Sequence, residues 1–335
     1  MGNNPPPAPR IVIAGAGAIG CYVGGMLAHA GLDVRFLGRA RMLDMLRNDG
    51  LHLTDYEGAR ISCAPDDLVL TDDPRVLREA DIVLVCVKSA GTAQMAALLG
   101  DNAPDGAVIV SLQNGMGHAA TLAAALPDHD IRPAMVPFNI VPMGQGRFHR
   151  ATSGDIVIGD GPMALDRILG VAGMAATQSA EIEAIQWGKF LLNLNNAPNA
   201  LSGLTLHAQL LSRPWRRLMA DQIAEALVVL RAHRCTIRAT TPVPVGLMPH
   251  VLRLPTPLFR RVAAKTLTID PQARTSMAHD LIGGRPTEID ALQGLIIEMG
   301  QQKSLATPIC SAMHKAVKRA ERDGFVPQPP EALRG

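Results

Sequence analysis

The chain of 335 residues has few aromatic side chains and almost no net charge. Only 3% of its residues are aromatic, so its core must be built from Ala, Val, Leu, Ile and 15 Met. The formal net charge of +2 is too weak for a protein whose main partner is nucleic acid. With 47% hydrophobic and 19% charged residues, the composition is that of a globular protein, and the length favours two domains.

The sequence also lacks paired cysteines and an uninterrupted membrane span. Its five cysteines are scattered and none forms a C-x-x-C pair, so we expect neither a metal site nor a disulfide framework. Free thiols fit a reducing compartment, and we expect a cytoplasmic protein. Residues 11–30 imitate the apolar part of a signal peptide, but five glycines interrupt them. We therefore expect no membrane partner.

The pattern of apolar residues differs between the two halves of the chain. The first half alternates β-branched runs with small-residue runs, which is typical of a parallel α/β sheet. Strands are expected at residues 11–14, 33–37, 82–87, 108–111, 135–141 and 155–158, with a hairpin at 51–63. Helices are expected at residues 19–30, 41–48 and 164–180. From Trp187 onward the pattern is helical.

These patterns predict an α/β protein of two domains. An N-terminal, Rossmann-type domain with a parallel sheet is expected at residues 10–181, and an all-helical C-terminal domain at residues 182–325. A disordered leader at residues 1–9 and a tail at 326–335 flank them. Residues 231–275 hold six prolines and eight lysines and arginines. This segment is either a basic collar for anionic ligands or a solvated, proline-kinked surface.

A glycine-rich loop follows the first expected strand. Its residues Gly15, Ala16, Gly17, Ala18, Ile19 and Gly20 form the pattern G-x-G-x-x-G between a strand and a helix. Glycines let the chain turn tightly there and let backbone N–H groups approach a pyrophosphate. The second expected strand ends at Leu37-Gly38-Arg39, without the acid that would bind a ribose hydroxyl. An arginine suits a 2′-phosphate, so we predict NADPH as the cofactor.

Two further polar clusters follow expected strands of the first half. Lys88-Ser89 comes after the strand at 82–87, and Gln113-Asn114-Gly115 after the strand at 108–111. The carboxyl ends of parallel strands are where such a sheet binds ligands.

In the second half, Lys189, Asn193 and Asn196 lie at i, i+4 and i+7 and predict a polar stripe on one helix face. Amides beside one lysine indicate a ligand cleft rather than the solvated face of a helix. Further on, Thr287 and Asp290 resemble a capping box, which would place Glu288 in the first turn of a helix. The helix dipole alone could explain a carboxylate at that point.

Taken together, these motifs resemble those of the ketopantoate reductase family. The matching features are the loop at 15–20, Val87-Lys88-Ser89, Gln113-Asn114-Gly115, Lys189-x-x-x-Asn193, and Ser276 twelve residues before Glu288. The resemblance extends from Arg10 to about Glu321. It implies a Rossmann domain, a helical domain and a cleft between them, with NADPH-dependent reduction of 2-dehydropantoate (ketopantoate) to pantoate.

The resemblance also implies roles for single residues. Lys189 would be the general acid, because its ammonium group can donate a proton as hydride transfer creates an alkoxide. Glu288 would hold Lys189 or the substrate hydroxyl and lie near the cofactor. The implied substrate-binding residues are Asn114, Asn193, Asn196 and Ser276. The implied cofactor contacts beyond the glycine loop are Arg39, Lys88 and Asn114.

One departure from the family pattern leaves the substrate open. Family members often carry a second asparagine one turn after the first, and this chain has Ala197 there. Another branched 2-oxo acid is therefore an alternative substrate. A non-catalytic NADP sensor is an alternative of another class, although a sensor needs no proton donor such as Lys189. The expected partner is a small-molecule 2-oxo acid, and the sequence is compatible with a homodimer.

Overall fold

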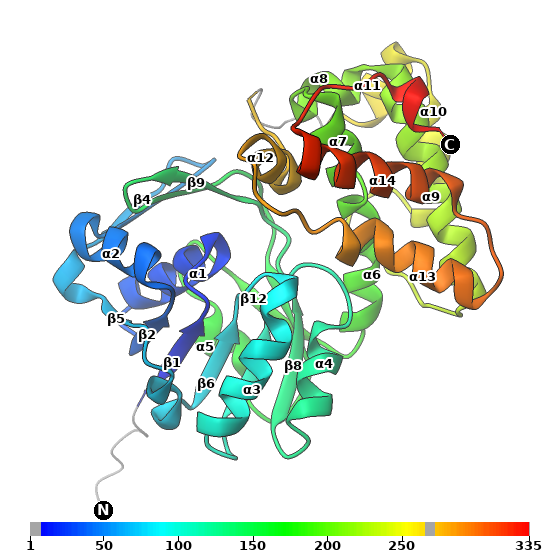
Figure 1. Ribbon diagram of the computed structural model, residues 1–335. Coiled ribbons are helices and arrows are strands. Elements are labelled where there is room, and N and C mark those ends of the chain that lie inside the picture. The colour runs from blue at the N-terminus through cyan, green and yellow to red at the C-terminus, as the bar shows by residue number, and fades with distance from the viewer. Residues whose placement is uncertain (1–7, 265–271, 335) are drawn as a thin grey trace, which may run out of the picture. The chain divides into compact units, whose positions relative to one another are not determined.

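The chain divides into two units, Met1–Ile182 and Glu183–Gly335 (Figure 1). The computed structural model describes residues 8–264 and 272–334. Most of the expected leader therefore lies outside the described residues. Within those two ranges, no helix has the length and apolar character that crossing a bilayer requires.

A sheet of eight strands organises the first unit. Its order is β12-β11-β8-β7-β6-β1-β2-β5, and neighbouring strands are parallel except β8 and β11. The strands are β1 (Ile11–Ala14), β2 (Val34–Leu37), β5 (Val69–Thr71), β6 (Ile82–Val85), β7 (Val108–Ser111), β8 (Asp130–Met135), β11 (Ile156–Gly159) and β12 (Ala176–Ser179). From β1 the sheet grows through β2 and β5 on one side and through β6, β7 and β8 on the other. This is the doubly wound order of a Rossmann-type sheet.

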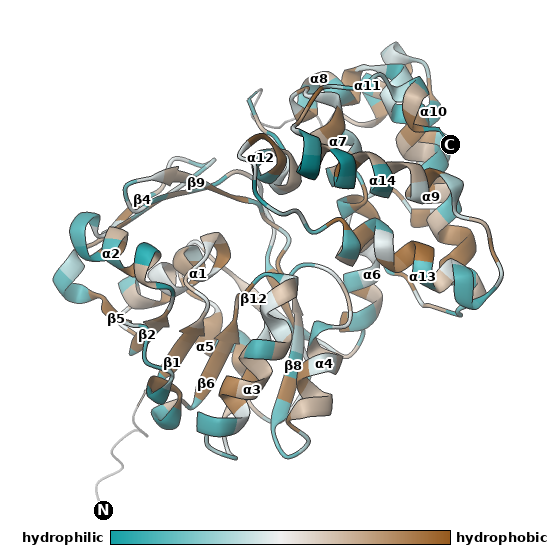
Figure 2. Cartoon of the chain, viewed as in Figure 1, coloured by the Kyte–Doolittle hydropathy of each residue, from teal (hydrophilic) through white to brown (hydrophobic). Residues whose placement is uncertain are grey.

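The central strands are apolar on both faces, because helices cover both (Figure 2). Ile11 and Ile13 of β1 belong to the core beneath α1 (Ala18–His29). Val12 and Ala14 belong to the core beneath α3 (Thr92–Asn102) and α4 (His118–Ala125). Successive side chains of a strand point to opposite faces, so four apolar residues in a row predict a doubly covered strand.

A second sheet, of order β4-β3-β10-β9, packs against α1. Its strands are β3 (Leu51–Asp55), β4 (Arg60–Cys63), β9 (Ile140–Gly144) and β10 (Arg147–Arg150). Helix α1 fits between the two sheets because glycines lie on both of its sides. A Cβ atom at Gly24 would lie 2.5 Å from the Phe36 ring, and one at Gly25 would lie 2.4 Å from Leu51. The hairpin expected at residues 51–63 is present as β3 and β4.

Two elements of the first unit differ from the prediction. The helix expected at residues 164–180 is only α5 (Leu165–Leu169), and strand β12 follows it. Gly170 ends the helix, Gly173 has a φ of +81°, and the chain returns to pair in parallel with β11. The single strand expected at residues 135–141 is the end of β8 and the start of β9, which belong to different sheets.

Helices make up the second unit. They are α6 (Ile182–Asn193), α7 (Asn196–Ser202), α8 (Leu206–Leu211), α9 (Arg213–Ala232), α10 (Met248–Arg253), α11 (Thr256–Val262), α12 (Ser276–Ile282), the π-helix η5 (Asp290–Gly294), α13 (Leu295–Gln302) and α14 (Pro308–Asp323). The expected tail packs on this unit, since Leu333 is 1% exposed and Arg334 pairs with Asp221. The predicted fold class, a parallel-sheet domain followed by a helical domain, is confirmed.

Candidate functional site

Two glycines of the loop at residues 15–20, and Gly38 after β2, have no room for a side chain. A Cβ atom at Gly20 would lie 2.2 Å from Gly15 O, and one at Gly15 would lie 2.9 Å from Val87 N. Gly15 also has a φ of +115°, which favours glycine. A Cβ atom at Gly38 would lie 2.8 Å from the Cβ atom of Ala16. The backbone is therefore bare where a pyrophosphate would approach it, and the loop fits a dinucleotide.

The loop lies where the order of the sheet reverses. Strand β1 has β2 on one side and β6 on the other, and Gly15 N donates to Leu37 O over 2.9 Å. Arg39 follows Leu37 by two residues, at the N-terminus of α2 (Ala40–Asp49), and its side chain is exposed. Open α/β sheets bind ligands at such a switch point. The structure thus brings Arg39 to the same edge of the sheet as the loop.

Buried hydrogen bonds tie together the turns after β6 and β7. Gln113, which is 7% exposed, donates through Nε2 to Val87 O over 3.1 Å and to Thr92 Oγ1 over 2.7 Å. Lys88 and Asn114, the predicted ligand-binding residues of these turns, are both exposed. The packing indicates a structural role for Gln113 and leaves Lys88 and Asn114 accessible.

In the second unit, Lys189 lies in the last two turns of α6 and is half-buried. Burial lowers the pKa of Lys189 to about 8. Asn193 is the last residue of α6, and Asn196 is the first of α7. The polar stripe expected on one helix is therefore divided between two helices, and in this respect the prediction is wrong. A turn at Leu194 and Asn195 separates the two helices.

A set of buried amides stabilises this helix break, and the sequence analysis missed it. Gln209 exchanges two hydrogen bonds with Asn195 and accepts a third from Asn199 Nδ2 over 3.1 Å. Asn199, which is fully buried, accepts from Thr275 N over 3.0 Å. Since α12 begins at Ser276, these bonds fix the start of α12 beside α7. The sequence signal that could have indicated this arrangement is the four asparagines among residues 193–199.

The capping box expected at Thr287 does not form. The Thr287 hydroxyl and N–H both donate to Glu321 Oε1, over 2.7 and 2.8 Å, and Asp290 pairs instead with His314 and Lys318. Glu288 lies two residues before the π-helix η5, and its carbonyl oxygen accepts from Leu292 N over 3.2 Å. It therefore stands at the N-terminal end of that helix, and the dipole explanation stays open. Isolated π-turns occur often at functional sites.

The π-helix is also tied to the break between α6 and α7. Gln293, which is fully buried, donates to Leu194 O over 2.8 Å. The segment that follows Glu288 is thereby fastened next to Asn193 and Asn196. The expected face of Ile289, Leu292 and Ile296 is buried.

His279 and the basic segment at residues 231–275 have protein partners among the described residues. His279 is half-buried on α12, and burial, with Arg274 and Arg285 nearby, lowers the pKa of its imidazole. In the basic segment, Arg253 pairs with Asp221 and Arg274 donates to Gly203 O. Residues 265–271 of that segment lie outside the described residues, and neither interpretation of it is tested.

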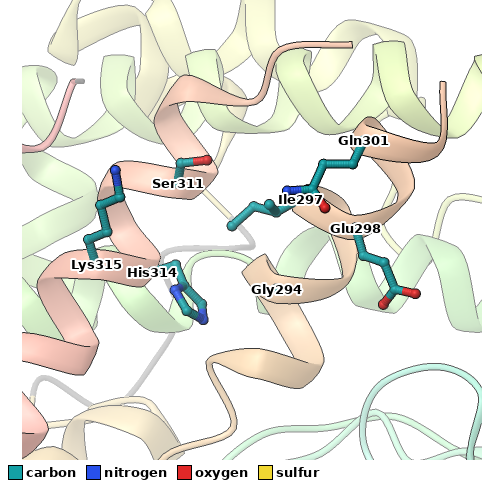
Figure 3. A pocket seen from close by; sticks show the side chains of 7 residues that line it. All are labelled: Gly294, Ile297, Glu298, Gln301, Ser311, His314 and Lys315. Atoms are coloured by element: carbon teal, nitrogen blue, oxygen red, sulfur yellow. The ribbon is translucent and has the colours of Figure 1, made fainter. Parts of the chain in front are cut away.

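A cavity of about 440 Å³ in the second unit does not coincide with these residues (Figure 3). It is a groove between α13 and α14, lined by Gly294, Ile297, Glu298, Gln301, Ser311, His314 and Lys315. In Figure 3 the Glu298 carboxylate and the Lys315 ammonium point away from each other.

A doubly wound sheet with a bare glycine loop, followed by a helical unit that carries a lysine of lowered pKa, defines a nicotinamide-dependent oxidoreductase. Two family models match the chain: "Ketopantoate reductase PanE/ApbA" over residues 11–163, and "Ketopantoate reductase PanE/ApbA C terminal" over residues 181–321. The chain therefore belongs to the ketopantoate reductase family, whose members act on a CH–OH group.

Individual relatives agree with this assignment. The chain is 32% identical to a 2-dehydropantoate 2-reductase of Halobacterium salinarum, over 94% of this chain and 100% of the relative. The crystal structure of a PanE/ApbA family ketopantoate reductase from Ralstonia eutropha has a TM-score of 0.78 at 29% identity, covering 94% of this chain and 99% of that chain. A D-mandelate dehydrogenase with NADH and anilino(oxo)acetate shares the fold, with a TM-score of 0.77 at 21% identity. The match covers 95% of this chain and 100% of that chain.

Proposed function

We propose that the protein reduces 2-dehydropantoate to pantoate, with hydride from NADPH and a proton from Lys189. The observation that carries the proposal is the position of Lys189 on α6, the helix that opens the second unit of a ketopantoate reductase family member, where burial lowers its pKa to about 8. A lysine of ordinary pKa, about 10.4, would hold its proton too tightly to be an efficient acid near neutral pH. A pKa of about 8 leaves Lys189 charged at pH 7 and still able to release its proton.

The first unit would hold the cofactor. Backbone N–H groups of the loop at residues 15–20 bind the pyrophosphate, and the exposed guanidinium of Arg39 binds the 2′-phosphate. Lys88 and Asn114 contact the cofactor from the neighbouring turns. NADPH, when bound, supplies the hydride.

The second unit would bind the 2-oxo acid and move the proton. Lys189 hydrogen-bonds the ketone oxygen and donates its proton to that oxygen as the alkoxide forms. Glu288 holds the Lys189 ammonium or the substrate hydroxyl in place. The residues that bind the substrate are Asn114 of the first unit and Asn193, Asn196 and Ser276 of the second.

The direct test is NADPH oxidation by the purified protein with 2-dehydropantoate beside a panel of other 2-oxo acids. The proposal expects a kcat/KM for 2-dehydropantoate at least tenfold above that of every other acid. Turnover only on another acid would keep Lys189 as the proton donor and reject the substrate. No turnover on any acid, despite tight NADPH binding, would reject the reaction.

A different 2-oxo acid is the second candidate substrate, and Ala197 is the observation that favours it. Ala197 is fully buried in α7, where an asparagine side chain would add polar groups. The D-mandelate dehydrogenase neighbour, solved with NADH, shares only the fold. The panel therefore includes the 2-oxo acid that corresponds to mandelate, and each acid is assayed with NADPH and with NADH.

We further propose that the protein acts in the cytoplasm, as the scattered free thiols suggest, and that it forms a homodimer. A family neighbour from Staphylococcus aureus is described as dimeric, at 16% identity. Light scattering of the purified protein tests the assembly, and a mass equal to one chain at micromolar concentration would reject the homodimer.

A further inference from the structure

One histidine that the sequence analysis passed over joins the turns that follow β6 and β7. His118 is the first residue of α4. Its Nε2 atom lies 2.9 Å from the main-chain oxygen of Asn114 and 3.3 Å from Ser89 Oγ. Its Nδ1 atom lies 3.3 Å from Thr92 Oγ1. The imidazole therefore contacts both of the turns that carry predicted cofactor-binding residues.

The chemistry of the partners decides which atom donates in one of these hydrogen bonds. Asn114 O is a carbonyl oxygen, which can only accept, so His118 Nε2 must be the donor. The Thr92 hydroxyl that meets Nδ1 is itself held, because it donates to Ser89 O over 2.9 Å and accepts from Gln113 Nε2. In a neutral ring Nδ1 can only accept, and the single hydrogen of the Thr92 hydroxyl is already given to Ser89 O, so the bond that fixes the ring is the one from Nε2.

The segment that His118 holds contains two glycines in left-handed backbone conformations. Asn114 is exposed, and the glycines at 115 and 117 have φ values of +99° and +83°. Glycine loses the most conformational freedom when it is ordered, so a turn with two glycines needs an anchor. The bond from His118 Nε2 to Asn114 O closes this turn from its far end.

We propose that His118 is a positioning residue that holds the Asn114 amide in place for the nicotinamide end of the cofactor. This inference rests on the proposed function, which places Asn114 beside the nicotinamide and the substrate. His118 itself touches neither. Gln113 already ties the two strand ends together, so the loss of the His118 bonds is expected to loosen the turn without unfolding the sheet.

Two substitutions separate positioning from packing. His118→Phe keeps a planar ring of similar size and removes the hydrogen bond to Asn114 O. His118→Gln keeps an N–H group that can reach Asn114 O. His149→Phe is the matched control, because it removes a partly buried bond to Thr54, of 2.8 Å, in the second sheet.

We expect His118→Phe to lower kcat by about 10- to 100-fold, since small displacements of a reacting group have effects of that size. His118→Gln should recover kcat to within about threefold, because one hydrogen bond is retained. In the cofactor-free protein, amide hydrogen exchange at residues 114–117 should accelerate in His118→Phe and remain normal in His118→Gln and His149→Phe.

Wild-type kcat and wild-type exchange in His118→Phe would overturn the inference. A lower Tm with unchanged kcat would also overturn it, since it would assign His118 to packing alone. If the wild-type protein reduced no 2-oxo acid, the proposed function would fail by itself. Hydrogen exchange and the NADPH Kd, measured by nucleotide fluorescence, would then still decide whether His118 orders the turn.

Discussion

The two units build their candidate sites from different materials. In the first unit the centre of the site is a backbone loop packed so tightly that a Cβ atom at Gly20 would lie only 2.2 Å from Gly15 O. In the second unit the site is side chains, and buried amides such as Asn199 and Gln209 hold helix ends in place. A backbone site depends on shape, whereas an amide framework depends on matched donors and acceptors.

This difference teaches how far apart in the sequence the parts of a site can be. The glycine loop is six consecutive residues. The amide framework instead joins Asn199 to Thr275, 76 residues away, and Leu194 to Gln293, 99 residues away. Substitutions in the first unit should therefore affect the cofactor, and those in the second the proton transfer, the substrate or the fold of that unit.

The largest effect is expected from Lys189→Ala. Loss of a general acid lowers turnover by about 10²- to 10⁴-fold, while the Kd for NADPH should change little. Steady-state kinetics and nucleotide fluorescence measure the two effects. Lys303→Ala, at an exposed lysine after α13, is the control and should retain wild-type turnover. Unchanged turnover in Lys189→Ala would remove Lys189 from the mechanism.

Gly20→Ala should give the next largest effect, on the cofactor. The added methyl group collides with Gly15 O, and overpacking of this kind typically costs about 1–3 kcal/mol. We expect the Kd for NADPH to rise by about 10- to 100-fold, equivalent to that range. Gly106→Ala serves as the control, because its Cβ atom would meet nothing within 4 Å. Equal NADPH affinity in both variants would show that the loop does not bind the cofactor.

The same contrast explains what could be predicted from the sequence. Spacing within short segments predicted the glycine loop and the central strands of the parallel sheet, because these features depend on neighbouring residues. It did not predict Gln209 or Gln293, whose partners come from distant helices. The capping box at Thr287 was wrong because Glu321, 34 residues away, accepts the Thr287 N–H that the Asp290 carboxylate would accept in such a box. The helix at 164–180 was wrong because pairing with β11 outweighed local preference.

Arg39→Ala tests which nucleotide the first unit prefers. A charge-assisted hydrogen bond to phosphate contributes about 1.5–3 kcal/mol, so the KM for NADPH should rise by about 10- to 100-fold. The KM for NADH, which has no 2′-phosphate, should change by less than about threefold. Arg41→Ala, at another exposed arginine two residues on, is the matched control. Equal changes for both nucleotides would reject the assignment of Arg39 to the 2′-phosphate.

The pH dependence of reduction tests the role of Lys189 in the wild-type protein, where no substitution alters the stability of the fold. Burial lowers the pKa of Lys189 to about 8, and reduction needs the protonated form. At saturating NADPH, kcat/KM for the 2-oxo acid should be level below pH 8 and fall about tenfold per unit above it. Oxidation of the hydroxy acid needs the neutral amine and should rise with pH until about 8. A profile of reduction that is level through pH 9.5 would contradict the role of Lys189.

The smallest effect should come from Asn199→Ala, which reaches the substrate site only through the fold. Removal of the amide leaves Thr275 N without its acceptor and Gln209 with one bond fewer, and a buried unsatisfied group costs about 1–3 kcal/mol. The Tm should fall. The KM for the 2-oxo acid should rise a few-fold, because the start of α12 at Ser276 loosens. The Kd for NADPH should stay unchanged. Gln302→Ala, at an exposed amide bonded to Glu298, is the matched control and should stay within about 0.5 kcal/mol of the wild type. If Asn199→Ala weakened NADPH binding as strongly as substrate binding, the glycine loop of the first unit and the amide framework of the second would not act separately.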